Sequence, residues 1–391
     1  MDTVDGTRPR RATGPSVHHL EHSTPSGRER KLLFLVAAGG RILRRVIDAV
    51  VPEEAGDDAL ARDLPVILDA FDLGVLAESP HYLADGLMNR NWRVSTSQGC
   101  FAVKLIVDVP LEVAGRNLGA LSALASAGLP VCTPLATSGG NAVAEVDGRG
   151  YCIIEWVDGD HVRGNDLDLD RAALLGEQLG QIHRVLDRHP PGPVPLAPPP
   201  AGATPAEKAM MAADGYLDMI DSLRAPAAFD RAAADSLEQR KELLAKYADQ
   251  SPRGEVPAGP WGWTHGDFQY RNILWRESRV VAVLDWDRLR VRPYAEEVVR
   301  TAQVQFGVEG RFDLDRVRAF VAGYRRVIDL RADDLADGVH RLWWKRMTDF
   351  WQLSFHYKRG DHGCDDLFLA DEALLHWWTD RLDEVQDAMA G

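Results

Sequence analysis

The sequence has few cysteines, and none of them stands in a pairing pattern. Only four of its 391 residues are cysteine, they are scattered along the chain, and no Cys-x-x-Cys pair occurs. Disulfide frameworks and cysteine zinc sites need denser, regularly spaced cysteines. The pattern therefore predicts reduced thiols in a cytoplasmic protein.

Long apolar runs and an excess of basic residues are also missing. The most apolar run near the N-terminus, residues 32–40, is too short to cross a bilayer and is followed at once by arginines. The Arg10-Arg11 pair lies far upstream of that run and no clear cleavage pattern follows, which disfavours export. The net charge is -14, and an acidic chain repels nucleic-acid phosphates. Neither a membrane nor a nucleic acid is expected as a partner.

The chain is large enough for more than one folded part. At 45% hydrophobic residues and 391 residues, two or three domains are expected. We divide the chain into a disordered tail with an amphipathic extension (1–59), a smaller folded part (60–158) and a larger folded part (159–391). No internal repeat is found.

The first folded part reads as a small mixed sheet with helices. Helical spacing covers residues 60–71 and 111–127, and Gly128 ends the second helix. Between them, two strand-like runs in 87–106 are joined by a Gly-containing turn, which predicts a hairpin.

After residue 159 the pattern becomes mostly helical. A long helix is predicted over 169–189, and a Pro-rich segment separates it from two further helices. The aromatic stretch 340–357 also has helical spacing, which favours a core helix over the wall of an acceptor cleft. The fold class is α+β, with a small β-rich lobe followed by a larger helical lobe. The aromatic candidates are Trp343, Trp344, Phe350, Trp351 and His356.

One polar segment stands out between hydrophobic neighbours. In "HGDFQYRNILW" the spacing is His265-x-Asp267-x-x-x-x-Asn272, and a second strand-like run, "VVAVLDWD", follows a short turn. If the two runs pair as a hairpin, Asp267, Asn272 and Asp285 lie at one rim. Two carboxylates and an amide oxygen suit Mg²⁺, and an Asp beside it suits phosphoryl transfer. The alternative is an ordinary polar turn.

Lys104 is a second isolated signal. It lies in the otherwise apolar run "FAVKLI", where a buried ammonium group needs an anionic partner. The phosphates of ATP are one such partner. The alternative is an edge-strand lysine that points to solvent.

Together these segments resemble the aminoglycoside phosphotransferase and choline kinase-like family, which shares the protein-kinase fold. "HGDFQYRNIL" and "VLDWD" are similar to its catalytic and metal-binding segments. The resemblance implies Asp267 as catalytic base and Asn272 and Asp285 as metal ligands, with Asp287 as a weaker metal candidate. His265 is expected to support the loop, and Glu296 to play a structural part.

The resemblance also implies where ATP binds. "DGLMNRNWRV" is similar to the loop that covers the phosphates, and "YCIIEWVDG" is similar to the hinge that binds adenine. Kinase folds usually hold the strand lysine with a helix glutamate, but that register falls near Asn117 here, and the only acid on the helix is Glu112. The implied nucleotide-binding residues are Lys104, Gly86, Asn89, Asn91, Glu155, Trp156 and Val157.

The function that follows is ATP- and Mg²⁺-dependent phosphorylation of a small molecule that bears a hydroxyl group. The Ala-, Arg- and Gly-rich composition tilts the choice toward an antibiotic-modifying enzyme. The alternatives are a metabolite kinase of choline, homoserine or thiamine type, and a nucleotide-binding pseudokinase without catalysis. His183 is expected in the core, and the protein is expected to be a monomer or a homodimer.

Overall fold

The structure, a computed structural model, describes residues 55–83 and 89–390. Side chains are described from residue 60 onward. Residues 1–54 of the predicted tail and extension, and the loop glycine Gly86, lie outside the described residues. The described residues all belong to one compact unit. No helix among the described residues has the length and apolar character needed to span a membrane.

An antiparallel five-stranded sheet forms the first part of this unit, in the order β1-β2-β3-β5-β4. The predicted hairpin is confirmed as β2 and β3, in register from Arg90 opposite Leu105 to Thr96 opposite Gly99. Alternate residues of β3 (Phe101, Val103 and Leu105) are buried, as the two-residue period of a strand requires. The strands are β1 (His81–Leu83), β2 (Arg90–Thr96), β3 (Gly99–Ile106), β4 (Ala144–Val146) and β5 (Arg149–Glu155).

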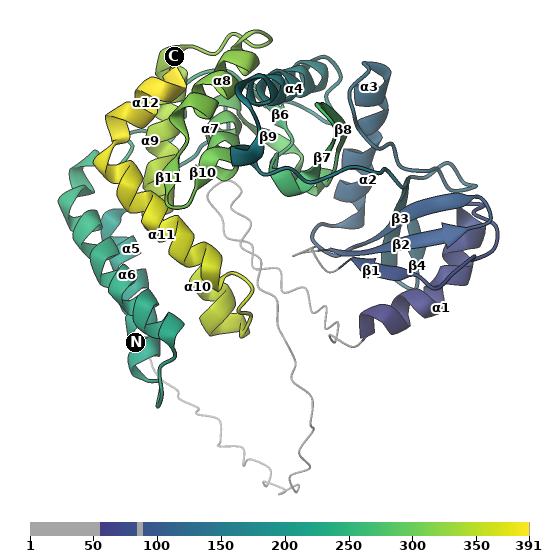
Figure 1. The fold of residues 1–391 in the computed structure, drawn as a ribbon, viewed down its shortest axis with the longest axis horizontal. Helices are drawn as coiled ribbons and strands as arrows, with labels where there is room; N and C mark the ends of the chain where they lie inside the picture. The colour runs from purple at the N-terminus through teal and green to yellow at the C-terminus, as the bar shows by residue number, and fades with distance from the viewer. Residues whose placement is uncertain (1–54, 84–88, 391) are drawn as a thin grey trace, which may run out of the picture. The chain divides into compact units, whose positions relative to one another are not determined.

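Helix α1 (Ala55–Ala70) covers one side of this sheet (Figure 1). Its apolar side chains join those of the strands in one hydrophobic cluster. A buried carboxylate, Asp63, also ties the helix to β5: it accepts hydrogen bonds from Arg149 at 2.7 Å and from the Tyr151 hydroxyl at 2.6 Å. The helix predicted over 60–71 is therefore confirmed as the cover of the sheet.

The helix predicted over 111–127 is in fact two helices, α2 (Leu111–Gly119) and α3 (Leu121–Ser126). Around the break the backbone makes the tighter i→i-3 hydrogen bonds, from Ala120 to Asn117 and from Ala123 to Ala120. The buried apolar side chains of both helices belong to the second, larger hydrophobic cluster, which is that of the helical lobe.

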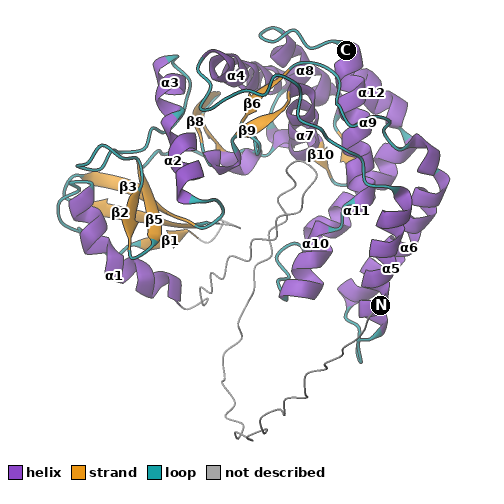
Figure 2. Ribbon diagram, turned by 180° about the vertical axis from the view of Figure 1, so that it is seen from behind, coloured by secondary structure: helices purple, strands orange, loops and turns teal. Residues whose placement is uncertain are grey.

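The second lobe is mostly helical, as the sequence predicts, and Figure 2 shows its helices in purple around short strands. The helix predicted over 169–189 is present as α4, and no helix or strand occurs in the Pro-rich residues 190–205. The longer helices are α4 (Leu169–Arg188), α5 (Ala206–Asp221), α6 (Ala228–Lys246), α7 (Tyr294–Phe306), α8 (Leu314–Arg325), α9 (Ala332–Thr348), α11 (Asp365–Asp380) and α12 (Leu382–Ala390). Shorter elements are α10 (Trp351–Leu353) and a π-helix, η5 (Ser354–Arg359).

The aromatic stretch is largely core, as favoured above. Trp343 and Trp344 in α9 are almost completely buried, and Phe350 is 6% exposed. The indole N–H groups of the two tryptophans donate hydrogen bonds to Thr379 and to the Thr204 carbonyl. Trp351 and His356, in contrast, keep part of their surface exposed.

Short hairpin strands place the polar segment of the sequence. β6 (Trp261–Thr264) pairs with β9 (Arg290–Pro293), and β7 (Ile273–Arg276) pairs with β8 (Arg279–Val283). The loop between β6 and β7 is the segment that carries Asp267 and Asn272, and β8 leads directly to Asp285. A small pair, β10 (Gly307–Val308) and β11 (Arg311–Phe312), follows α7.

Helices α4 and α8 approach each other through glycines. A Cβ added at Gly323 of α8 would lie 1.9 Å from the Ala173 carbonyl oxygen, and one added at Gly176 of α4 would lie 1.8 Å from the Phe320 carbonyl oxygen. Because the blocking atoms are backbone atoms, no side-chain movement can make room. The close contact of these two helices therefore depends on small residues.

We predict that Gly323→Ala destabilises the protein by about 1–3 kcal/mol, the usual cost of overpacking. Gly215→Ala in α5 is the matched control, because a Cβ there meets nothing within 4 Å and alanine favours a helix. Urea unfolding of both variants measures the difference. Equal stability of the two variants would contradict the close packing of α4 on α8.

Candidate active site

The loop between β6 and β7 needs a glycine at its second position. Gly266 has φ +83°, in the region that disfavours side chains, and an added Cβ would lie 2.2 Å from the Arg288 carbonyl oxygen. The backbone therefore turns sharply between His265 and Asp267 and packs against the segment after β8. The turn brings Asp267 to the same side as that segment.

A buried carboxylate of α7 holds this turn. Glu297 is 2% exposed and accepts hydrogen bonds from two successive backbone N–H groups, those of His265 (3.0 Å) and Gly266. It also pairs with His183 Nε2 at 2.6 Å. Burial opposes the ionised form of Glu297, but these donors outweigh it and lower its pKa. The structural acid is thus Glu297; Glu296, which the sequence suggested, forms a partly exposed pair with Arg292.

Two buried histidines complete the support of the loop. His183 is fully buried, with the Tyr324 hydroxyl 2.8 Å from its Nδ1, which confirms a core position. His265 is also fully buried; its Nδ1 accepts the Asp267 N–H, and its Nε2 lies 3.0 Å from the Leu284 carbonyl oxygen. Burial lowers the pKa of His265, so the ring is neutral at pH 7. In this arrangement His265 supports the loop, as expected.

Asp267 is held by three side chains. Its Oδ1 lies 2.6 Å from Arg300 Nη2, and its Oδ2 accepts hydrogen bonds from Gln269 (2.8 Å) and Asn272 (3.0 Å). Burial alone would raise the pKa of this carboxyl, but Arg300 and Gln269 outweigh it and keep the pKa below its usual range. Asp267 is therefore a carboxylate, with the charge state of a proton acceptor, at neutral pH.

Asn272 and Asp285 lie at the same end of one hairpin. The Leu284 N–H donates to the Asn272 carbonyl oxygen at 2.8 Å, just before Asp285. The Asn272 side-chain amide N–H groups donate to Asp267, to both its backbone oxygen and its carboxylate, which turns Oδ1 of Asn272 away from Asp267. The expected grouping of Asp267, Asn272 and Asp285 at one rim is thus what the hairpin produces.

Lys104 joins the sheet to this rim. Its Nζ lies 2.7 Å from Asp285 Oδ1 and 2.8 Å from Asp287 Oδ1. Burial disfavours the charged form, but the two carboxylates outweigh it and raise the pKa of Lys104. The lysine side chain is only 17% exposed and has the anionic partners that its burial demands, so it does not point to solvent.

Asp287 and Asn89 fix the position of this ion pair. The second oxygen of Asp287 accepts a hydrogen bond from Asn89 Nδ2 at 2.8 Å, while Asn89 Oδ1 accepts from the Val107 and Asp108 N–H groups. Both oxygens of Asp287 are therefore bound to protein groups. Asp285 is 36% exposed and has left-handed backbone geometry (φ +59°), which makes it the more accessible carboxylate.

The helix glutamate of kinase folds is replaced by a different contact. Asn117 of α2 is buried, and its Nδ2 donates to the carbonyl oxygens of Trp286 (3.1 Å) and Asp287 (3.0 Å). Glu112 lies exposed in the first turn of α2. Asn117 thus couples the helix to the loop that carries the carboxylates, and the carboxylates themselves hold Lys104.

The remaining residues implied for nucleotide binding lie around the sheet. Asn91 stands opposite Lys104 in the β2–β3 ladder. β5 ends at Glu155, and the Trp156 N–H donates a hydrogen bond to the Cys100 carbonyl oxygen. Val157 follows, half-buried, before the chain pairs with β7 at Asp160.

The oxygen set fits a divalent cation that prefers hard ligands. Asp285 supplies a partly exposed carboxylate, and the amide orientation of Asn272 presents Oδ1 rather than Nδ2 on the side away from Asp267. Mg²⁺ takes one or two such ligands and completes its shell with water and phosphate oxygens. These two residues would hold the cation, and Asp287 is already committed to Lys104 and Asn89.

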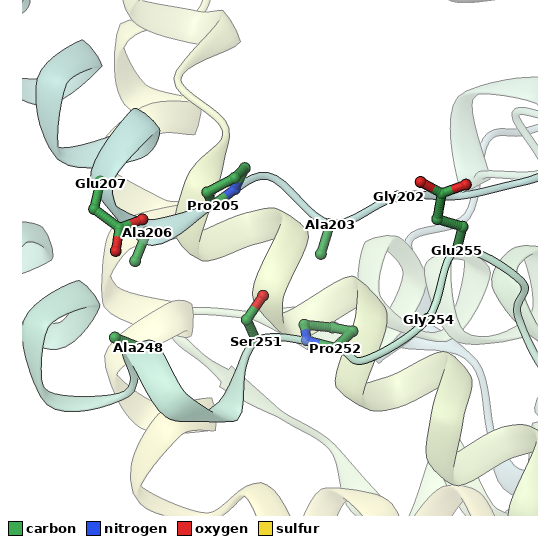
Figure 3. Close-up of a pocket in the computed structure, with 10 residues that line it drawn as sticks. All are labelled: Gly202, Ala203, Pro205, Ala206, Glu207, Ala248, Ser251, Pro252, Gly254 and Glu255. Atoms are coloured by element: carbon green, nitrogen blue, oxygen red, sulfur yellow. The ribbon is translucent and has the colours of Figure 1, made fainter. Parts of the chain in front are cut away.

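A separate pocket of about 350 Å³ lies between the segments 202–207 and 248–255 (Figure 3). Its walls are mainly alanine, glycine and proline, with the carboxylates of Glu207 and Glu255 on opposite sides. None of the residues at the Asp267 rim lines it. It supplies no group for phosphoryl transfer, and we assign it no role.

The family profile described as "Phosphotransferase enzyme family" matches residues 81–330, well over half of the chain. The chain belongs to the phosphotransferase enzyme family. This confirms the resemblance and makes the protein an enzyme, a small-molecule kinase with an alcohol group as acceptor. Curated relatives include a homoserine kinase of Xanthobacter autotrophicus, 25% identical over 71% of this chain and 80% of the relative. Another, from Phenylobacterium zucineum, is 26% identical over 69% and 76%.

Solved structures confirm the two-lobed, protein-kinase-like α+β fold. An amicoumacin kinase in complex with AMP-PNP and Ca²⁺ has a TM-score of 0.53 at 16% identity, covering 85% of this chain and 96% of its own. A microcompartment-associated aminopropanol kinase also has a TM-score of 0.53 at 16% identity, covering 84% and 100%. At these identities the likeness establishes the fold, and the site is argued from this chain's own residues.

Three contributors to the site escaped the sequence analysis or were given another role. Glu297 was passed over for its neighbour Glu296, and Arg300 was not considered. The signal for both is their spacing of three on α7, which puts them on one helix face toward the loop. Asn89 was expected near phosphates through its backbone, whereas its side chain bonds Asp287.

We predict that Glu297→Gln lowers stability by about 3 kcal/mol, because it breaks a buried charged contact and sets an amide N–H group against backbone N–H donors. Glu238→Gln in α6 is the matched control and should cost less than about 0.5 kcal/mol, because it breaks only a solvent-accessible i,i+3 pair with Lys241. Urea unfolding at pH 7 compares the two variants.

The pH dependence separates this explanation from simple loss of packing. The pKa of Glu297 is lowered in the folded protein, so its stabilising effect is present above the unfolded-state pKa and is lost as the pH falls below about 4. The difference in the free energy of unfolding between wild type and Glu297→Gln should narrow in that pH range. A constant gap from pH 7 to pH 3.5 would contradict the role of the charge.

Proposed function

We propose that the protein transfers the γ-phosphoryl group of ATP, with Mg²⁺, to the hydroxyl of a small metabolite. The observation that carries the proposal is the convergence of Asp267, Asn272, Asp285 and Lys104 at one rim in a member of the phosphotransferase family. Lys104 contacts Asp285, and Asn272 contacts Asp267, and the retention of all four groups disfavours a pseudokinase.

In this proposal each group has one task. Asp267, kept ionised by Arg300, orients the acceptor hydroxyl and accepts its proton. Lys104 binds the ATP phosphates, and Asn272 and Asp285 hold Mg²⁺, which neutralises phosphate charge when it is bound. Cytoplasmic ATP and the four free cysteines are consistent with a cytoplasmic enzyme.

For the acceptor we favour a small amino-acid-like alcohol of the homoserine class. The curated relatives named above are homoserine kinases. In addition, Arg300 lies directly beside Asp267. A cation next to the base favours an acceptor that carries a carboxylate. An antibiotic acceptor, which the sequence composition suggested, is the second candidate, and the name of the amicoumacin kinase supports it.

A panel of acceptors decides between these classes. With labelled ATP and Mg²⁺, L-homoserine should be phosphorylated with a higher kcat/KM than aminopropanol, choline, thiamine, spectinomycin or kanamycin. A higher kcat/KM for an aminoglycoside would replace the metabolite assignment by the antibiotic one. ATP binding with no labelled acceptor would favour the pseudokinase.

We predict that Asp267→Asn lowers kcat by about 10²–10⁴-fold, the usual contribution of a positioned base, and leaves the Kd for ATP nearly unchanged. Asp235→Asn on the exposed side of α6 is the matched control and should keep full activity. Turnover with the best acceptor and equilibrium ATP binding are the two measurements. An active Asp267→Asn variant would remove Asp267 from its role.

We also predict a shifted pH profile for Arg300→Met. Arg300 helps to lower the pKa of Asp267, so removing its charge raises that pKa. Because the base works in its ionised form, activity is lost as the pH falls through this pKa, and the acidic limb of kcat/KM moves to higher pH. A limb that stays in place while kcat falls would mean that Arg300 acts only on substrate position.

A further inference from the structure

Two histidines and an aspartate converge near the C-terminal end of the chain, in residues that the phosphoryl-transfer site does not use. His356 lies on the π-helix η5, His362 in the loop after it, and Asp365 at the first position of α11. His356 Nδ1 lies 3.0 Å from His362 Nδ1 and 3.0 Å from Asp365 Oδ2, and His362 Nδ1 lies 3.4 Å from the same carboxylate oxygen. Each residue thus turns one potential ligand atom toward a common point.

These separations match the spacing of ligand atoms around one metal ion. With metal–ligand bonds of about 2.0–2.2 Å, neighbouring ligands lie about 2.9–3.6 Å apart in tetrahedral or octahedral geometry. The two imidazole nitrogens and the carboxylate oxygen therefore span one triangular face of such a shell. We propose that His356, His362 and Asp365 bind a divalent cation of the zinc class.

The second nitrogen of His356 supports this assignment independently. His356 Nε2 faces the carboxylate of Asp230 in α6, with 3.5 Å between Nε2 and Oδ1. Metal-bound histidines almost always direct their other ring nitrogen at such a carboxylate or carbonyl, which orients the ring and makes it a better ligand. Asp230 is itself buried and anchored by the Tyr357 hydroxyl and the Ala227 N–H.

The surroundings orient one ligand and leave another accessible. The His356 ring stacks on Phe229, with 4.5 Å between ring centroids, and its side chain is only 11% exposed. His362 is 65% exposed, so a cation can enter from solvent and find an open coordination position for water. A single π-helical turn is a local irregularity that often occurs at functional sites, and here it presents His356.

The local charges also favour a cation at this point. The two neighbouring cationic side chains are directed at aromatic rings: Lys358 lies over Tyr216 and Arg359 over Phe355. Imidazole nitrogen with one carboxylate selects zinc-class metals over Mg²⁺, which prefers oxygen ligands. The site is therefore chemically distinct from the Asn272–Asp285 rim and would join the loop 360–364 to η5 and α11.

Zinc binding by the full-length protein, stripped with EDTA, tests the proposal. Isothermal titration with ZnCl₂ should show one tight equivalent in the wild type and in His189→Ala, which removes an exposed histidine elsewhere. His362→Ala and Asp365→Asn should each weaken this equivalent by at least about 100-fold, because even the loss of a group that only orients a metal ligand costs about 10–100-fold. Weak binding by His18, His19 and His22 is common to all four proteins and cancels in the comparison.

Asp230→Asn adds a test of the histidine orientation. It should weaken zinc binding by about 10–100-fold, whereas Tyr357→Phe, which removes another partner of the same carboxylate, should weaken it less. Co²⁺ should give visible absorption bands with the wild type that His362→Ala lacks. Equal zinc affinity of His362→Ala and wild type, or no tight equivalent in the wild type, would overturn the proposal. The phosphorylation assay with the acceptor panel tests the Asp267 site separately, and neither outcome of the zinc titrations decides it.

Discussion

The arrangement of the site depends on one buried carboxylate that accepts two successive backbone N–H groups. Glu297 fixes the turn at His265 and Gly266, and the turn in turn fixes where Asp267 points. Because Glu297 and Arg300 lie on the same face of α7, a single helix both holds the loop and supplies the cation that keeps Asp267 ionised. The residue that supports the loop and the residue that keeps Asp267 ionised therefore lie on one rigid helix. Rigid support of this kind holds catalytic side chains in a fixed geometry.

The connection between the lobes has a different basis from the lysine–glutamate pair of other kinase folds. Here Lys104 of the sheet pairs with Asp285 and Asp287, and Asn117 of α2 binds the backbone of the same segment. Asn89 completes the contact from β2's side of the sheet. Helix α2 thus positions residues 285–287 by binding two of their backbone carbonyl groups. The negative charge that neutralises Lys104 comes from carboxylates in those same residues.

Much of the site could be predicted from the sequence because its parts are close in the chain. The spacing from His265 to Asn272 and the following hairpin decide the relative places of Asp267, Asn272 and Asp285. The partners of Lys104 could not be predicted, since they lie about 180 residues away and depend on how the lobes meet. Nor could Glu297 be told from Glu296: adjacent acids on a helix point about 100° apart, and only packing decides which one is buried. The break between α2 and α3 follows Gly119, but a single glycine inside an apolar helical pattern does not by itself end a helix, so the pattern predicts one continuous helix.

The central claim is that this site transfers phosphate to a hydroxyl through Asp267. Phosphorus NMR of a reaction that contains the protein, ATP, Mg²⁺ and L-homoserine tests it most directly, because it distinguishes a phosphate ester from inorganic phosphate. The account predicts that the γ-phosphate signal is converted to a phosphomonoester signal with the wild type, and that Asp267→Asn leaves ATP intact. Release of inorganic phosphate alone, or equal ester formation by both proteins, would contradict it.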